Sequence, residues 1–208
     1  MNVLAIGAHF DDVELGCGGT LAKHVANRDR VTVYVATKSG FANPMKKIVR
    51  SDDAASREGQ TAMDILGAKL CRGSFGTNDV EFTDALASDI IKVVESSRAD
   101  IVYTHWVGDI HHDHQAVARA SLHSCRHVPR MLMYRSNWYH STSDFRGNFY
   151  IDVTGHWKTK EQVIRAHRSE MKRTGKAWLQ FFKNEAENAG QKIGVEYAEV
   201  FEVVKWLW

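Results

Sequence analysis

Short apolar runs alternate with longer amphipathic stretches along the first two-thirds of the chain. The apolar runs, rich in β-branched residues, predict buried strands at Val3–Ala8, Val31–Ala36, Leu70–Phe75, Ile101–Thr104 and Met131–Tyr134. The amphipathic stretches predict helices at Val13–Asn27, Ser51–Leu66, Thr83–Ser97 and His112–His127. This alternation is typical of an α/β fold with a Rossmann-like, mostly parallel sheet and helices on both faces.

The pattern changes after Tyr134. Phe149–Val153 and Ala198–Trp206 predict two more strands, and one or two helices are expected across Lys158–Glu187. The chain contains no internal repeat and no linker long enough to separate a second domain. We therefore expect residues 1–208 to form a single domain, which is long enough to bury its own core.

Composition narrows the possible partners. The formal net charge of +2 is too small to make nucleic acid or a membrane surface the main partner. No stretch has the pattern of a transmembrane span. Cys17, Cys71 and Cys125 are widely spaced and form no C-x-x-C pair, which favours a reducing compartment and leads us to expect a cytoplasmic protein.

A first cluster of candidate metal ligands lies where the first predicted strand ends, in the segment Gly7-Ala8-His9-Phe10-Asp11-Asp12-Val13-Glu14. Imidazole and carboxylate groups are suitable ligands for zinc and similar divalent ions. Consecutive residues of a tight turn point in different directions, so one Asp could bind a metal while its neighbour faces a water molecule. The alternative is that Asp11 or Asp12 only caps the following helix, and this segment alone does not decide between the two.

Glycines follow this cluster in Leu15-Gly16-Cys17-Gly18-Gly19. They do not form a G-x-G-x-x-G motif directly after the strand, and the second strand ends in Thr37-Lys38-Ser39 without the acidic residue that would bind a ribose. We therefore interpret them as small residues that let a helix pack closely on the sheet.

The second cluster, Asp109-Ile110-His111-His112-Asp113-His114-Gln115, follows the fourth predicted strand. His111 and His114 are three residues apart and can face one side of a helical turn, although a solvated helix start is the alternative. Parallel strands end at one edge of their sheet, so both clusters fall at that edge. A His and an Asp from the first cluster with one His from the second would leave an open position, as in catalytic zinc sites.

These segments resemble the PIG-L/LmbE-like family of zinc-dependent N-deacetylases. The family's A-H-P-D-D-x-E motif reads Ala8–Glu14 here, and its H-x-D-H motif reads His111–His114. Weaker similarities lie in Arg57–Gly67, Lys160–Glu170 and Tyr197–Phe201. The resemblance therefore extends over nearly the whole chain.

The resemblance implies that His9, Asp12 and His114 bind zinc and that Asp11 is the general base. It implies hydrolysis of an N-acyl group, with acetyl as the expected acyl group and a metal-bound water as nucleophile. The expected partner is a small-molecule amino sugar or sugar conjugate, and the sequence leaves open whether it is linked to a nucleotide or lipid. It also leaves open whether the protein is a homo-oligomer. Iron(II) could occupy the same ligands, because His and carboxylate discriminate weakly between metals.

The same resemblance implies roles on the substrate side. It places His111 beside the developing oxyanion with Asp113 tuning it, and it makes Arg57 a contact for substrate oxygens. Two positions depart from the family pattern: Phe10 replaces the usual proline, and Glu170 replaces the usual glutamine. The loss of proline removes a fixed φ angle but no ligand.

Two other classes of function fit part of this pattern. A non-haem iron oxygenase could use His9-Phe10-Asp11 with His114 as an H-x-D…H triad. The predicted strand–helix alternation counts against the antiparallel barrel expected around that triad, and Asp12 would have no role. A non-catalytic sugar- or nucleotide-binding module is the second alternative, but the presence of all three ligands and a base counts against it.

Overall fold

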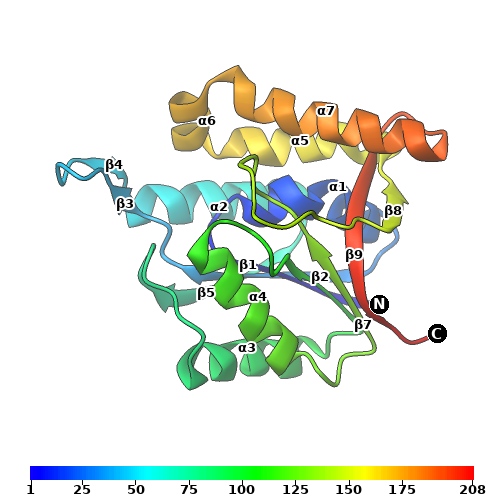
Figure 1. The fold of residues 1–208 in the computed structure, drawn as a ribbon, viewed down its shortest axis with the longest axis horizontal. Coiled ribbons are helices and arrows are strands. Elements are labelled where there is room, and N and C mark those ends of the chain that lie inside the picture. The colour runs from blue at the N-terminus through cyan, green and yellow to red at the C-terminus, as the bar shows by residue number, and fades with distance from the viewer.

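The computed structural model describes residues 1–208, which form a seven-stranded sheet with the strand order β5-β2-β1-β6-β7-β9-β8 (Figure 1). Five strands are parallel: β5 (Lys69–Phe75), β2 (Arg30–Thr37), β1 (Asn2–Gly7), β6 (Ile101–His105) and β7 (Arg130–Tyr134). Two are antiparallel to their neighbours: β9 (Ala198–Trp206) and β8 (Phe149–Asp152). The mostly parallel α/β fold predicted from the apolar pattern is confirmed.

The first four helices lie where the amphipathic pattern predicts them: α1 (Asp12–Ala26), α2 (Asp52–Leu66), α3 (Asp84–Ser97) and α4 (His112–Ser124). Local sequence signals set the ends of α2. The Ser51 hydroxyl accepts a hydrogen bond from the N–H of Ala54, and Gly67 ends the helix with φ +79°, a conformation that glycine adopts without strain.

The last third of the chain contains three helices instead of the one or two predicted: α5 (Trp157–Ala166), α6 (Arg168–Thr174) and α7 (Lys176–Ile193). His167 separates the first two, and Gly175, with φ +65°, separates the last two. A short 3₁₀ turn, Thr154–His156, precedes them. None of the helices combines the length and apolar character needed to span a membrane.

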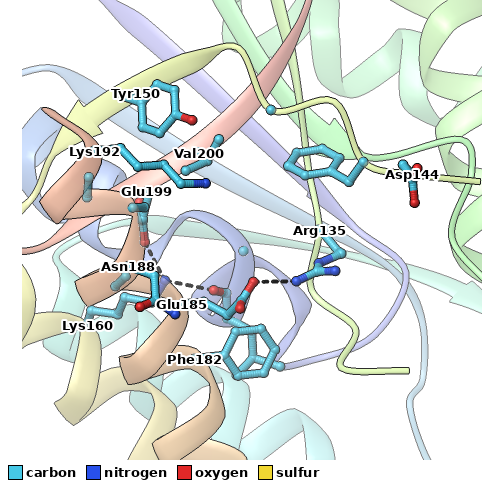
Figure 2. Close-up of a pocket in the computed structure, with 17 residues that line it drawn as sticks. Arg135, Asp144, Tyr150, Lys160, Phe182, Glu185, Asn188, Lys192, Glu199 and Val200 are labelled. Atoms are coloured by element: carbon cyan, nitrogen blue, oxygen red, sulfur yellow. Dashed lines mark hydrogen bonds and ion pairs between the residues drawn. The ribbon is translucent and has the colours of Figure 1, made fainter. Parts of the chain in front are cut away.

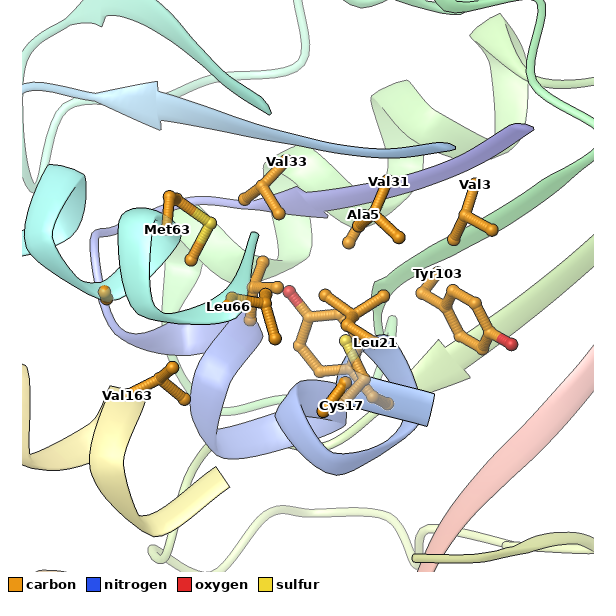
Figure 3. Packing of buried hydrophobic residues seen from close by; sticks show 14 of the residues in the cluster. Val3, Ala5, Cys17, Leu21, Val31, Val33, Met63, Leu66, Tyr103 and Val163 are labelled. Atoms are coloured by element: carbon orange, nitrogen blue, oxygen red, sulfur yellow. The ribbon is translucent and has the colours of Figure 1, made fainter. Parts of the chain in front are cut away.

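Helices cover both faces of the sheet. Successive side chains of a strand point to opposite faces, so both sets are buried. Val3 and Ala5 of β1 pack on the face covered by α1 and α2, as Figure 3 shows. Leu4 and Ile6 of the same strand pack on the face that α3 and α4 cover. Figure 1 shows α5, α6 and α7 as a further layer over α1 and α2.

The glycines near the start of α1 allow close packing, as interpreted from the sequence. A Cβ atom at Gly16 would collide with the ring of Tyr134, which lies on β7. A Cβ at Gly19 would lie 3.0 Å from Val153. Larger residues would therefore push α1 off the sheet.

A small β-hairpin between β2 and α2 was not predicted. It consists of β3 (Phe41–Ala42) and β4 (Ile48–Arg50), which pair antiparallel apart from the main sheet. The main sheet grows from β1 towards β2 and β5 in one direction and towards β6 and β7 in the other. Such a reversal opens a crevice at the carboxyl ends of β1 and β6, where ligands bind in open α/β sheets.

Candidate metal centre

The two ligand clusters meet at the carboxyl ends of β1 and β6. His9 lies in the turn after β1, Asp12 is the first residue of α1, and His114 lies in the first turn of α4. His9 Nδ1 lies 3.2 Å from His114 Nε2 and 3.4 Å from one carboxylate oxygen of Asp12. The other carboxylate oxygen of Asp12 lies 3.2 Å from His114 Nε2. Two ligands of one tetrahedral zinc ion lie about 3.3 Å apart. These three residues therefore fit a small divalent cation, zinc included.

A carboxylate holds the second nitrogen of each histidine. His9 Nε2 is 2.8 Å from Asp113, and His114 Nδ1 is 3.2 Å from Asp109. Such pairs orient the ring of a metal ligand. Burial lowers the pKa of both histidines, but the neighbouring carboxylates outweigh it. Asp113 and Asp12 raise the pKa of His9 to about 9. Asp12 and Asp109 raise the pKa of His114 to about 10. The surrounding carboxylates therefore stabilise positive charge at the centre, and a metal ion would have to displace the protons of the two ligand nitrogens.

The carboxylate of Asp113 faces a metal ligand, which the sequence did not indicate. Besides His9, it accepts hydrogen bonds from the backbone N–H groups of Asn78 at 2.8 Å and Val80 at 3.1 Å. Although burial raises the pKa of Asp113, these hydrogen bonds lower it to about 2. The hydrogen bond to His111 comes from the backbone N–H of Asp113, at 3.2 Å. Tuning of His111 by this carboxylate therefore stays a prediction.

His111 presents a hydrogen-bond donor to the site. It is the N-cap residue of α4, and its Nδ1 accepts the N–H of Asp113, so that the ring proton lies on Nε2. Burial, together with His114 and His9, lowers the pKa of His111 to about 4 and keeps the ring neutral. Its ring stacks on that of His114 with centroids 4.6 Å apart.

Asp11 occupies the N-cap position of α1, but its side chain makes no capping hydrogen bond. Its φ of +119° is a conformation that residues other than glycine rarely adopt. The carboxylate instead accepts a hydrogen bond from Arg50 Nη1 at 3.1 Å, and the same nitrogen donates to the carbonyl of Phe10. Burial raises the pKa of Asp11 to about 7, although Arg50 lowers it. Asp11 lines the same cavity as His9, Asp12 and His114, so its role as a general base stays a prediction.

Arg50 belongs to a buried network that the sequence did not reveal. Its Nη2 lies 3.2 Å from Glu58 and 3.2 Å from Nδ1 of His167. His167 in turn contacts Glu14 at 2.8 Å, so the network joins the β3–β4 hairpin, α2, the α5–α6 junction and α1. Through Arg50, this network holds the carboxylate of Asp11.

Phe10, the departure from the usual proline, is buried against α2. A Cβ atom at Gly59 would collide with its ring, so the glycine makes room for the larger side chain. The backbone N–H of Phe10 donates to Ser39 Oγ at 2.9 Å. These contacts replace the φ restriction of proline in defining the turn that carries Asp11.

His105 also belongs to the site and was missed. It is the last residue of β6, and its Nε2 accepts the N–H of Ala8 at 3.0 Å and lies 3.2 Å from Asp12. Its ring stacks on His114 with centroids 4.1 Å apart. The strand-end criterion that identified the two clusters also applies to His105, whereas no local signal identified Arg50.

The metal trio opens into a cavity of about 240 Å³. Its polar and aromatic walls include Phe41, Arg50, Thr77, Asn78, His111, Ser136, Asn137, Trp138, Tyr139, Glu170, Arg173 and Trp178. Arg57 is exposed on α2 and does not line this cavity, so its contact with substrate stays a prediction. Arg50 and Arg173 are the guanidinium groups in the walls.

A larger cavity, about 590 Å³, lies between α7, β9 and the chain before β8 (Figure 2). Its ion pairs are Lys160–Glu199 and Arg135–Glu185. Glu199 also accepts the N–H groups of Gly19 and Thr20, so it satisfies backbone donors beyond a break in α1. This charge pair therefore has a structural role.

Comparison with known proteins agrees with the site. A family model described as PIG-L, GlcNAc-PI de-N-acetylase, matches residues 4–125, more than half of the chain, and includes both ligand clusters. A relative from Escherichia coli K12 named "Uncharacterized deacetylase YaiS" is 35% identical over 148 residues, covering 65% of this chain and 75% of the relative. The chain belongs to the PIG-L family.

Solved structures share the fold at low sequence identity. N,N'-diacetylchitobiose deacetylase from Pyrococcus horikoshii matches with a TM-score of 0.83 and 21% identity, covering 97% of this chain and 83% of that one. GalB, a 4-carboxy-2-hydroxymuconate hydratase from Pseudomonas putida KT2440, matches with a TM-score of 0.82 and 17% identity, covering 100% and 98%. Because this fold supports different reactions, the function has to be argued from the site.

Proposed function

We propose that the protein is a metal-dependent deacetylase that hydrolyses an N-acetyl group of an amino sugar or sugar conjugate. The observation that carries this proposal is the convergence of His9, Asp12 and His114 beside the carboxylate of Asp11. Membership of the PIG-L family and the deacetylase names of its relatives support the reaction class. The P. horikoshii protein of the same fold is named for an N-acetylated disaccharide, which supports a sugar substrate.

Zinc is the metal we propose for His9, Asp12 and His114. A bound zinc ion would supply a lowered pKa for water and polarisation of the amide carbonyl. Two imidazoles and one carboxylate with an open fourth position are typical of catalytic zinc sites. Iron(II) suits the same donors, so metal analysis has to decide between the two.

Two residues of the chain would carry out the proton transfers and charge stabilisation. Asp11 accepts a proton from the attacking water while the water oxygen forms a bond to the amide carbon. The N–H on His111 Nε2 donates to the carbonyl oxygen as negative charge develops there. When the C–N bond breaks, Asp11 returns the proton to the leaving nitrogen, which yields acetate and a free amine.

The oxygenase alternative requires Asp11 to be a metal ligand. Its carboxylate instead faces Arg50, and the neighbouring Asp12 lies within ligand distance of both histidines. The sheet around the site is also mostly parallel and not an antiparallel barrel. These observations favour the hydrolase.

Metal analysis combined with kinetics of two adjacent variants tests the proposal. The wild type is assayed for acetate release from N-acetyl sugars that are free, nucleotide-linked or lipid-linked. Asp12→Ala should lose bound metal, because it removes a ligand. Asp11→Ala should keep metal and lose roughly a hundred- to ten-thousand-fold in kcat.

Each other outcome has a definite meaning. If Asp11→Ala lacks metal while Asp12→Ala retains it, the two roles are reversed. If both variants keep metal and full activity, the aspartates serve only the start of α1. Absence of acetate release from the whole panel by the zinc-loaded wild type refutes the deacetylase proposal.

A further inference from the structure

One wall of the cavity contains a carboxylate oxygen without a partner. Glu170 is the third residue of α6, lines the cavity and is only 3% exposed. Its Oε2 accepts hydrogen bonds from the guanidinium of Arg173, with Nε at 2.7 Å. Its Oε1 is buried and has no hydrogen-bond partner. Buried polar atoms are nearly always hydrogen-bonded, so this oxygen requires an explanation.

The position of Glu170 is well defined by its neighbours. Ser169 donates its backbone N–H to Glu58 on α2 at 2.8 Å, which anchors the start of α6. The guanidinium of Arg173 lies over the ring of Phe41 at 5.9 Å, so the hairpin supports the partner of Oε2. Oε1 cannot turn to Arg173 without giving up the existing pair, and its direction is therefore set before a ligand arrives.

We propose that Glu170 determines substrate specificity, because its Oε1 accepts a hydrogen bond from a hydroxyl group of the sugar ring that carries the acetamide. This inference rests on the proposed function and names the part of the substrate that the wall recognises. Glu170 and Asp11 line the same cavity, whose size suits a single sugar ring. A ring hydroxyl and the scissile amide can therefore be bound together.

The Glu170 carboxylate favours a ligand group that donates a hydrogen bond. An ionised carboxylate only accepts hydrogen bonds, so an ether oxygen or a second anion at this position would face unpaired negative charge. The N–H groups of Arg173 that face Glu170 are already directed at Oε2. A neutral hydroxyl satisfies Oε1 and leaves that ion pair intact.

Coupling between Glu170 and individual hydroxyl groups tests the inference. The substrates are the N-acetyl sugar that the wild type cleaves fastest and its monodeoxy analogues, assayed one ring position at a time. For the wild type, one analogue should show kcat/KM reduced by about ten- to hundredfold, the usual effect of leaving a charged acceptor unpaired. In Glu170→Met, which removes both oxygens at similar size, this difference between sugar and analogue should disappear.

A second variant guards against a simple folding defect. In Glu170→Gln the amide oxygen should face Arg173, which places an NH₂ group where Oε1 was. The variant should fold and bind metal like the wild type, but its preference for the hydroxyl should be weaker, because a neutral amide donor replaces the charged acceptor. Glu161→Gln is the matched control, because Glu161 pairs with Arg165 one turn along α5 and does not line the cavity. It should keep the wild-type preference.

The inference and the proposed function fail in different ways. If the wild type cleaves an N-acetyl sugar but both Glu170 variants keep the full discrimination between sugar and analogues, the inference is wrong and an ordered water satisfies Oε1. An equal loss of kcat/KM on every substrate would mean that Glu170 only stabilises the wall, which also overturns it. If the wild type cleaves no member of the panel, the proposed function itself fails, and the inference fails with it.

Discussion

Replacement of Arg50 should cost both stability and turnover, because it leaves two carboxylates without their cation. The Arg50 side chain is 2% exposed and lies 3.1 Å from Asp11 and 3.2 Å from Glu58. At an effective dielectric constant of about 20, one such contact corresponds to about 5 kcal/mol of Coulomb energy. Removal of one partner from a buried pair typically costs about 3–5 kcal/mol after relaxation.

Arg50→Met should therefore lower Tm by roughly 6–20 °C, since 1 kcal/mol shifts Tm by about 2–4 °C in a chain of this size. Release of the strained backbone at Asp11 should also lower kcat, while metal content stays unchanged. Arg50→Lys should be intermediate, because it keeps the charge but loses the planar fork that serves several acceptors. Thermal unfolding, metal analysis and steady-state kinetics measure the three effects.

Arg72→Met is the matched control. Arg72 is exposed and hydrogen-bonds Ser56 and Gln60 at the surface, so its loss should change the free energy of unfolding by no more than about 0.5 kcal/mol. If Arg50→Met unfolds at the wild-type temperature with wild-type kcat, the turn itself holds Asp11. The role assigned to the buried network would then be wrong.

Asp113→Asn should weaken metal binding by about ten- to a hundredfold in chelator competition, because it removes the charge that orients His9. Unchanged affinity with reduced kcat would instead support the role that the family resemblance gives it. Arg57→Ala should lower kcat/KM and leave metal content unchanged, as the predicted contact with substrate oxygens requires; unchanged kinetics would mean that Arg57, which is exposed and outside the cavity walls, is only a surface residue of α2. Gly59→Ala should destabilise the fold by about 1–3 kcal/mol, because its Cβ collides with Phe10. A wild-type melting temperature for Gly59→Ala would show that the turn moves freely.

The order of elements along most of the chain was determined by local sequence. Apolar runs of five to eight residues alternate with amphipathic stretches long enough for helices, and this pattern requires a sheet covered on both faces. The location of the ligand clusters after β1 and β6 followed from the same pattern. His9, Asp12 and His114 were named together from the motif resemblance, and the structure brings them within ligand distance.

Short or interrupted elements could not be predicted in the same way. The hairpin has strands of two and three residues, too short to show periodicity. In the last third, the breaks at His167 and Gly175 divide one amphipathic region into three helices. Both features lie beside the cavity, where they contribute Phe41, Arg50 and Glu170.

Only the tertiary structure decided which charged side chains reach the site. Arg50 and Arg57 are equally polar in the sequence, but the hairpin carries Arg50 to Asp11 and His167, which are 39 and 117 residues away along the chain. Likewise, the carboxylate of Asp113 turns towards His9, 104 residues away. Burial and pairing of charges arise only when distant segments pack together, so no local pattern contains them.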